Sequence, residues 1–227
     1  MLPGLDGTGD LFDRLVRAIG SDLITRVVRY PNDPTLGYAG YVEIVRKEIA
    51  GRRMFLLGES FSGPVAMMLA AQLPAQIMGL VLAATFLENP WPGWLIRRAA
   101  RVDPLTTPVR IRDALLMGPY GDTELSAKVD DIVKNLPRAV RAARLRAVAG
   151  VDVRADFARV RCPILVLHGR SDRIVRKSPM QRAVADKGGA RMIVLPAAHM
   201  LLQTRANEAA SEIVHFTHSA MEIPYEA

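Results

Sequence analysis

The stretch LLGESFSGP, residues 56–64, decides how the rest of the chain is interpreted. An apolar run ends on a Glu-Ser pair, and small residues typical of a helix start follow it. A strand that ends on a serine and turns at once into a helix is typical of a nucleophile elbow, where the hydroxyl lies at the edge of a parallel sheet. An ordinary strand-to-helix turn fits this stretch equally well. The interpretation therefore depends on whether the remaining sequence supplies partners for Ser60.

The chain outside this stretch repeats one scheme, in which an apolar run is followed by glycine or proline and then by a helical pattern. This scheme predicts an α/β protein with a mainly parallel sheet and helices on both faces. The predicted strands are 23–30, 53–58, 78–86, 163–169 and 191–196, and the predicted helices are 10–20, 39–50, 61–73, 178–187 and 204–219. Half of the 227 residues are apolar, which is enough for one sizeable core.

The pattern changes between Glu88 and about Arg161, where prolines separate helical pieces and no comparable strand appears. We interpret this region as a helical insertion. The predicted organisation is a first core part over 1–87, a helical lid over 88–160, and a second core part over 161–227.

Charge and apolar patterning restrict the partners of the chain. The formal net charge is +7 and the sequence pI is about 10. Arg138, Arg141 and Arg144 recur at three-residue steps and are predicted to share one helix face, either solvated or used for docking an anionic partner. Nucleic-acid binding is not predicted, because no binding motif or interleaved aromatic residues accompany the charge.

Location and redox state follow from what the sequence lacks. No stretch reaches the roughly 18–20 apolar residues of a membrane span, and the first ten residues do not resemble a signal peptide. We therefore expect a cytoplasmic protein. Its one cysteine, Cys162, precedes an apolar run and is expected to be a buried small side chain rather than a nucleophile.

A serine hydroxyl becomes a useful nucleophile when a base accepts its proton and a carboxylate orients that base. Asp172 lies in LHGRSDRIV, just past the strand 163–169, and His199 lies in LPAAHMLLQ, just past the last strand. Both residues therefore belong at the carboxyl ends of parallel strands, the edge where such sheets assemble sites. The predicted catalytic residues are Ser60 as nucleophile, His199 as base and Asp172 as orienting acid.

Other residues of the same types fit these roles less well. The rivals are Glu88, Asp152 and Asp156 for the acid, and His168, His215 and His218 for the base. None of the three acids follows a strand as strong as 163–169. The first histidine ends a strand, where packing is the better interpretation, and the other two sit on the final helix without polar companions. Ser62, the second hydroxyl of the motif, is interpreted as a spacer or a supporting residue.

Two backbone N–H groups are expected to stabilise the oxyanion of a tetrahedral intermediate, each contributing roughly 3–4 kcal/mol. One belongs to Phe61, the residue after the nucleophile. The other is assigned to Leu5 in the glycine-rich loop LPGLDGTG, residues 2–9. A phosphate-binding turn is the weaker interpretation of this loop, because lysine and the G-x-G-x-x-G spacing are absent.

These motifs together resemble the α/β-hydrolase superfamily across nearly the whole chain, through LPGLDGTG, GESFSG, HGRSDRIV and PAAHM. Within it the chain is similar to small bacterial esterases with a helical lid, including pimeloyl-[acyl-carrier-protein] methyl ester esterases. The resemblance implies a Ser60–His199–Asp172 triad without metal or organic cofactor. Pro3-Gly4 stands where these proteins usually have His-Gly. The resemblance also implies a central strand before the oxyanion loop, and since the loop begins at residue 2, we expect that strand to be missing. Either a gap or direct closure of its neighbours would follow.

The expected activity is cleavage of a carboxylic ester through an acyl-enzyme intermediate. The apolar lid residues expected to bind substrate are Trp91, Trp94, Leu116 and Met117. Arg97, Arg98 and Arg101, with the predicted arginine face, suggest docking of an acidic acyl carrier protein that presents a tethered ester. Thioesterase and lactonase activities use the same groups and stay open, as does an inert ligand-binding homologue of the hydrolases.

Overall fold

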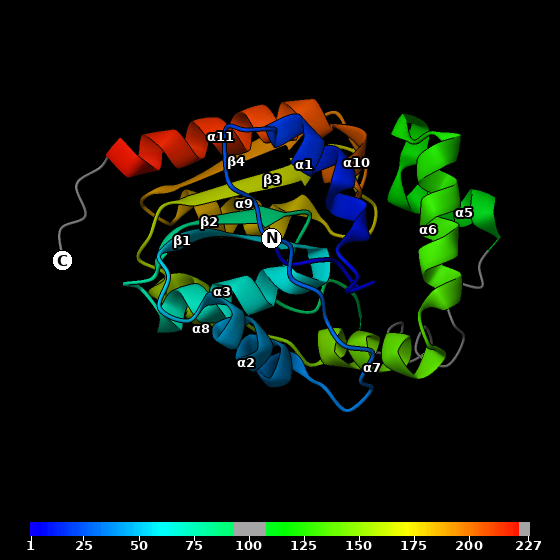
Figure 1. The fold of residues 1–227 in the computed structure, drawn as a ribbon, viewed down its shortest axis with the longest axis horizontal. Helices are drawn as coiled ribbons and strands as arrows, with labels where there is room; N and C mark the ends of the chain where they lie inside the picture. The colour runs from blue at the N-terminus through cyan, green and yellow to red at the C-terminus, as the bar shows by residue number, and fades with distance from the viewer. Residues whose placement is uncertain (93–107, 223–227) are drawn as a thin grey trace.

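The computed structural model describes residues 1–92 and 108–222, and its centre is a four-stranded parallel sheet (Figure 1). The strands are β1 (Met54–Glu59), β2 (Ile77–Ala83), β3 (Ile164–Gly169) and β4 (Ala190–Leu195), in the order β1-β2-β3-β4. Each strand matches a predicted one to within a few residues. Because all four run in the same direction, the loops that follow them meet at one edge of the sheet.

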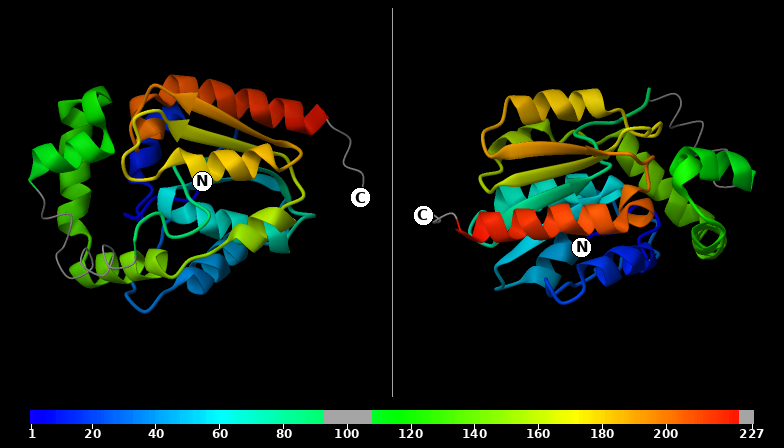
Figure 2. Two further views of the ribbon diagram at one scale, coloured as in Figure 1. Left: turned by 180° about the vertical axis from the view of Figure 1, so that it is seen from behind. Right: turned by 90° about the horizontal axis from the view of Figure 1, so that it is seen from above.

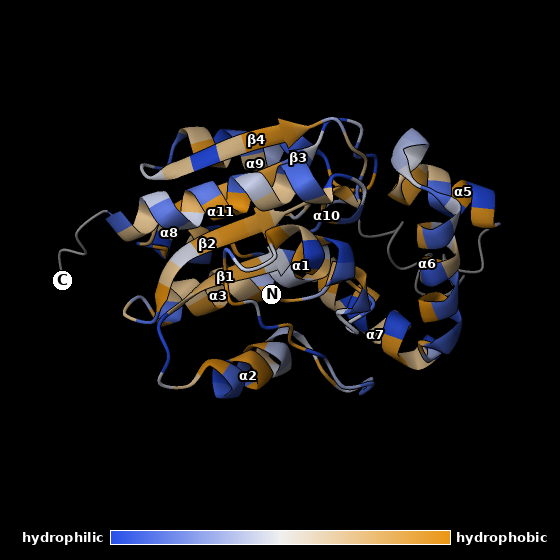
Figure 3. Ribbon diagram, turned by 45° about the horizontal axis from the view of Figure 1, so that its top comes forward, coloured by the Kyte–Doolittle hydropathy of each residue, from blue (hydrophilic) through white to orange (hydrophobic). Residues whose placement is uncertain are grey.

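Both faces of the sheet are covered by helices. Side chains alternate along each strand, so Leu56 belongs to one hydrophobic cluster and its neighbour Leu57 to the other. The first cluster is shared with α2 (Tyr38–Ile49), α3 (Gly63–Gln72), α8 (Arg154–Arg159) and α9 (Lys177–Ala185), and the second with α1 (Asp13–Ile19), α10 (Leu201–Thr204) and α11 (Ala206–Glu222). Figure 3 shows β2 as mostly hydrophobic, whereas α6 and α11 mix hydrophobic and hydrophilic residues. Burial on both faces explains the near-continuous apolar runs of the strands.

The strand predicted over 23–30 is wrong, because this segment has no regular secondary structure. Its composition suits a strand, but only scattered hydrogen bonds join it to the N-terminal residues of the described chain. Val28 N–H donates to the Met1 carbonyl at 3.0 Å, and Tyr30 N–H donates to the Gly7 carbonyl at 2.8 Å. The Met1 amino group also donates to the Arg26 carbonyl at 2.6 Å. Hydrogen bonds with Met1 and Gly7 alone do not make a continuous ladder.

Residues 1 and 2 lie between this segment and β1. Leu2 forms an isolated parallel bridge with Gly58, in which Leu2 N–H donates to Leu57 at 2.8 Å and Glu59 N–H donates to Leu2 at 3.2 Å. The carboxyl half of β1 is therefore paired on both sides, at the point where the strand delivers Ser60. The expected direct closure of the flanking segments is not seen, since Met1 and Leu2 separate them.

Within the predicted lid, α8 packs in the first hydrophobic cluster, whereas the other helices lie farther from the sheet. They are α5 (Val109–Leu116), η4 (Gly118–Tyr120), α6 (Thr123–Asn135) and α7 (Arg138–Ala149). Both views of Figure 2 place α5 and α6, in green, at one end of the molecule, opposite the end where α11, in red, terminates. Met200 N–H donates to the Leu116 carbonyl at 2.8 Å, which ties the end of α5 to the loop after β4. The boundaries of the lid, predicted at 88 and 160, stay a prediction.

The arginine face predicted on α7 is wrong, because its members point in different directions. Arg138 is exposed, Arg141 is half-buried and donates to the carbonyls of Val133 and Leu136, and Arg144 has no exposed surface. An α-helix turns by about 100° per residue, so residues six positions apart diverge by roughly 120°. The three other arginines of that expectation, at 97, 98 and 101, lie outside the described residues.

Cys162 is buried just before β3, and burial raises the pKa of its thiol to about 11. This agrees with the expectation of a small core side chain. Over the described ranges, no helix combines the length and the apolar character needed to cross a bilayer.

Candidate active site

Three loops at the carboxyl edge of the sheet bring Ser60, His199 and Asp172 together. Ser60 follows β1, Asp172 follows β3, and His199 follows β4. Ser60 Oγ lies 2.9 Å from His199 Nε2, and His199 Nδ1 lies 2.9 Å from Asp172 Oδ2. Both distances are those of hydrogen bonds, so a proton on the serine hydroxyl has a direct acceptor in the imidazole.

Asp172 is fixed by its own loop. Its side chain is fully buried, and its second oxygen, Oδ1, accepts hydrogen bonds from Ile174 N–H at 2.8 Å and Val175 N–H at 3.0 Å. Burial opposes ionisation, but His199 and these two N–H groups hold the pKa of Asp172 below its ordinary value. The carboxylate can therefore hold the ring of His199 in one orientation.

His199 is held between opposing influences. Burial disfavours its charged form, while the carboxylate of Asp172 and, more weakly, that of Glu59 favour it, and the net result is a raised pKa. An imidazole with a raised pKa is a stronger base toward the serine proton.

The backbone of Ser60 is in the left-handed region, with φ at 48°. This conformation is costly for a residue with a side chain, so surrounding contacts have to maintain it. Thr85 Oγ1, in the loop after β2, donates a 2.6 Å hydrogen bond to the Ser60 carbonyl. The turn then continues as η2 (Ser60–Ser62) into α3.

Two glycines give this turn its room. A Cβ on Gly58 would lie 2.7 Å from the Ser62 carbonyl oxygen, and one on Gly63 would lie 1.9 Å from Thr85 Oγ1. Ser62, which replaces a glycine of the usual motif, is fully buried. Its hydroxyl contacts the Tyr30 hydroxyl at 2.8 Å and donates to the Pro3 carbonyl. Ser62 thus joins the elbow to the glycine-rich loop.

The two predicted oxyanion donors, Leu5 and Phe61, belong to the glycine-rich loop and to the turn after β1. Phe61 directly follows it, with a buried ring stacked on Tyr38 at 5.0 Å and a carbonyl that accepts from the Tyr38 hydroxyl at 3.1 Å. Leu5 shares a cavity lining with Ser60 and His199. Among the described residues, no hydrogen-bond acceptor is recorded for the Leu5 N–H. That donor is consequently available to a ligand.

A cavity of about 130 Å³ opens beside Ser60. Its polar side is formed by Asp6, Glu59, Ser60 and His199. Its remaining wall is apolar and consists of Leu5, Leu11, Leu116, Val129, Ile132, Val133, Leu136 and Met200. Four of these apolar residues come from α6 and the residue that ends it, so the lid helix closes the cavity over the serine.

The sequence of the chain matches a known protein family. The family model described as "Serine aminopeptidase, S33" matches residues 32–203, which include all three of Ser60, Asp172 and His199. The chain belongs to this S33 hydrolase family. The family match and the parallel sheet agree with each other. The expected α/β-hydrolase superfamily and fold are therefore confirmed.

One curated relative and several solved structures resemble this S33 hydrolase. Human monoglyceride lipase is 28% identical over 144 residues, covering 59% of this chain and 46% of the relative, so the chain spans about half the relative's length. The enol-lactonase from Burkholderia xenovorans LB400 has a TM-score of 0.80 at 20% identity, covering 95% of this chain and 88% of that one. A thermophilic esterase from Thermogutta terrifontis has a TM-score of 0.79 at 17% identity, covering 94% and 86%. The structural likenesses at these identities concern the fold.

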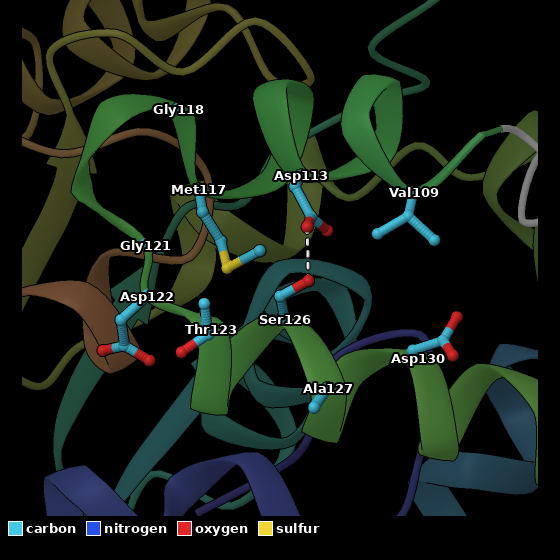
Figure 4. Close-up of a pocket in the computed structure, with 10 residues that line it drawn as sticks. All are labelled: Val109, Asp113, Met117, Gly118, Gly121, Asp122, Thr123, Ser126, Ala127 and Asp130. Carbon is cyan, nitrogen blue, oxygen red and sulfur yellow. Dashed lines mark hydrogen bonds between the residues drawn. The ribbon is translucent and has the colours of Figure 1, made fainter.

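The predicted substrate-binding residues of this S33 hydrolase occupy different places. Leu116 lines the cavity beside Ser60. Met117 instead lines a separate hollow of about 500 Å³ between α5 and α6, which also contains Asp113 and Ser126 (Figure 4). Trp91 donates from its indole to the Ile174 carbonyl at 2.7 Å and packs on the core. Trp94 lies outside the described residues.

Glu59 is a site residue that sequence reasoning did not single out. It lines the cavity next to Ser60, and its carboxyl accepts a 2.8 Å hydrogen bond from the buried amide of Gln203. Burial raises the pKa of Glu59 to about 7. A carboxyl directly before the nucleophile in GESFSG was the available signal, because the strand would point it inward beside the site.

His168, the rival base, is buried at the end of β3 with Nδ1 2.9 Å from the Gly169 carbonyl oxygen. It makes no contact with Ser60, in agreement with the packed role expected for it. In the described ranges, no group of three or more His, Cys, Asp or Glu side chains is arranged to hold a metal ion.

Proposed function

We propose that this S33 hydrolase cleaves carboxylic esters by nucleophilic catalysis at Ser60. The observation that carries the proposal is the continuous chain of contacts from Ser60 Oγ through His199 to Asp172, each 2.9 Å long, beside an apolar cavity. This is the relation that a serine nucleophile, its general base and its orienting carboxylate require.

The first half of the reaction forms an acyl-enzyme. Ser60 Oγ attacks the ester carbonyl carbon while His199 Nε2 takes the hydroxyl proton, and the carbonyl oxygen becomes an oxyanion. The N–H groups of Leu5 and Phe61 are the proposed donors to that oxyanion. The tetrahedral intermediate collapses as the carbon–oxygen bond to the alcohol breaks, and His199 returns its proton to the departing alkoxide.

The second half releases the acid. A water molecule attacks the acyl carbon as His199 again accepts a proton, and the bond to Ser60 Oγ breaks with protonation of that oxygen. Asp172 stays ionised throughout and stabilises the imidazolium that forms in each half.

The acyl group that suits the described cavity is short and uncharged. The cavity volume of about 130 Å³ lies below the roughly 300–1,000 Å³ of typical small-molecule pockets. Of the described residues that line the cavity, Asp6 and Glu59 carry carboxyl groups and none is a lysine or arginine, so the lining offers no cation to an acyl chain that ends in a carboxylate. We expect p-nitrophenyl butyrate to be a better substrate than the laurate ester.

The size limit has its own test. Ile132→Ala removes bulk from the α6 wall of the cavity, so the ratio of kcat/KM for octanoate to that for butyrate should rise about tenfold. An unchanged ratio would show that the acyl chain lies elsewhere.

The central test replaces Ser60 by Ala. Turnover of p-nitrophenyl butyrate and covalent labelling by a fluorophosphonate should both be abolished. Ser178→Ala, at an exposed position on α9, is the matched control and should leave both unchanged. Labelling or turnover retained in Ser60→Ala would contradict the proposal. An unmodified chain that never reacts with the probe would indicate the inert ligand-binding alternative.

Amide cleavage is a second candidate, because Asp6 and Glu59 offer carboxyl groups to a substrate amine in a family described as aminopeptidases. Both carboxyls already have partners, since Asp6 accepts from Thr8 and Glu59 from Gln203. These partners weaken the case for amine binding. Aminoacyl p-nitroanilides, assayed beside the esters, test it directly, and thioesters and lactones belong in the same assay. A carrier-bound acyl ester belongs in the same panel. The buried Arg144 cannot contribute to docking an acidic carrier protein, so it does not support that substrate.

A further inference from the structure

Arg144 of α7 is the largest of the fully buried side chains in the described ranges. A buried cation normally has a carboxylate partner, because removing a charge from water is costly. Within the described part of the chain, Arg144 forms no ion pair, and its acceptors are neutral. The identity of these acceptors therefore indicates why the Arg144 side chain is buried.

Two of the acceptors belong to the glycine-rich loop beside Ser60. Arg144 Nη1 donates to the Leu5 carbonyl at 2.9 Å and to the Asp6 carbonyl at 2.7 Å. Nη2 donates to the Pro31 carbonyl at 3.2 Å, and Nε donates to the Tyr41 hydroxyl at 3.0 Å. The guanidinium also lies 5.7 Å from the centroid of the Tyr41 ring, within reach of a cation–π contact.

These bonds fix the loop where a donor is needed. A peptide unit is planar, so holding the carbonyls of Leu5 and Asp6 fixes two consecutive peptide planes next to the Leu5 N–H. The elbow holds the preceding part of the loop, because Ser62 donates to the Pro3 carbonyl. The loop also makes room for the guanidinium, since a Cβ on Gly7 would lie 2.5 Å from Nη1.

We propose that Arg144 is a positioning residue that keeps the Leu5 N–H directed at the oxyanion formed on Ser60. The inference rests on the proposed function. Arg144 touches neither the substrate nor the reacting atoms, and it acts through the two peptide planes that it holds. Because it belongs to α7, the oxyanion hole is complete only while this helix of the predicted lid is docked on the loop.

The test compares Arg144→Met, Arg144→Lys and the control Arg146→Met, an exposed arginine on the same helix. Methionine keeps an apolar stem without donors, and lysine keeps the charge without the planar fork that reaches two carbonyls. With p-nitrophenyl butyrate we expect kcat to fall about 100-fold in the Met variant and about tenfold in the Lys variant, with KM nearly unchanged. The control should match the unmodified chain.

A second readout separates positioning from general support of the fold. A trifluoromethyl ketone adds to the serine and carries an oxyanion, so its Ki should rise by the same factor as kcat falls. The Ki of the matching unfluorinated ketone, which adds poorly to the serine and stays uncharged, should stay constant. Rates are taken per active site, by fluorophosphonate titration, below the melting midpoint of each variant.

The inference is overturned if kcat in the folded Lys variant stays within twofold of the unmodified chain, or if kcat falls while the ketone Ki does not change. If Arg144→Met does not fold, Arg144→Lys and Tyr41→Phe, which removes one acceptor of the guanidinium, carry the test. Absence of ester turnover in the unmodified chain would contradict the proposed function itself, so the two failures are distinguishable.

Discussion

Thr85 Oγ1 donates a 2.6 Å hydrogen bond to the carbonyl oxygen of Ser60, the residue with a left-handed backbone. The donor lies in the loop after β2, and the acceptor lies in the turn after β1. Neighbouring parallel strands thus cooperate, since one presents the candidate nucleophile and the next one holds its strained peptide in place. Thr85 itself is buried, so no water competes for this bond.

Thr85→Val tests this bond, because it removes the hydroxyl and keeps the shape of the side chain. We expect kcat for p-nitrophenyl butyrate to fall about tenfold with little change in KM, since the Ser60 peptide loses a partner that fixes the Oγ direction. Thr85→Ser keeps the hydroxyl and should retain most of the activity. Equal kcat in the two variants, measured per folded molecule, would show that the bond does not direct Ser60.

The pH dependence of turnover should follow His199. The base has to be neutral, and its pKa is raised by Asp172, so kcat/KM should increase with pH along one ionisation centred above the ordinary histidine value of about 6.5. Asp172→Asn removes the charge and leaves the ring misoriented. We expect a loss of about 10³–10⁴-fold in kcat and a midpoint moved to lower pH. A midpoint unaffected by this substitution would assign the titration to another group.

Glu59 should make stability fall as the pH rises. Its pKa is raised by burial from 4.5 to about 7, so the folded state favours the protonated form more than the unfolded state does. This stabilisation is complete below the pKa of Glu59 in the unfolded chain, and it is lost as the pH rises through the pKa in the folded chain. The group therefore removes up to roughly 3 kcal/mol of unfolding free energy between these limits.

Denaturant unfolding between pH 4 and 8 measures this effect. Glu59→Gln keeps the size of the side chain and does not ionise, so its unfolding free energy should depend less on pH than that of the unmodified chain. Glu222→Gln, at the exposed end of α11, is the control and should reproduce the original slope. Parallel curves for Glu59→Gln and the unmodified chain would contradict the assigned burial effect.

Gly63→Ala should destabilise the elbow. The added methyl would lie 1.9 Å from Thr85 Oγ1 and 2.5 Å from its Cγ2, so the start of α3 and the loop after β2 have to separate. We expect a loss of about 1–3 kcal/mol in unfolding free energy, together with lower kcat. Gly150→Ala has no atom within 4 Å of the new methyl and should change stability by less than about 0.5 kcal/mol.

The candidate catalytic residues were predictable because each depends on a local pattern. Ser60, Asp172 and His199 each stand in the loop that follows an apolar run, and the shared direction of the strands brings these loops to one edge. Their convergence thus follows from strand direction alone. The predicted strands at these positions needed no knowledge of side-chain packing.

The errors arose where the outcome depends on distant partners. LITRVVRY, residues 23–30, has the composition of a strand, but the residues available to pair with it are Met1 and Gly7. Arg144 looks like a surface charge, yet its acceptor Asp6 is 138 positions away. A regular spacing of arginines does not reveal which one turns inward. The carbonyl oxygens that receive it come from another part of the chain.

The inertness of Cys162 makes the folded chain suitable for site-specific fluorescence. It is the single cysteine of the sequence, is buried, and has a pKa of about 11, so maleimide reagents have no thiolate to attack under native conditions. Ala139→Cys would place one reactive thiol at an exposed position of α7. A dye attached there would report, in real time and without removing the native cysteine, when this helix leaves its place over the loop.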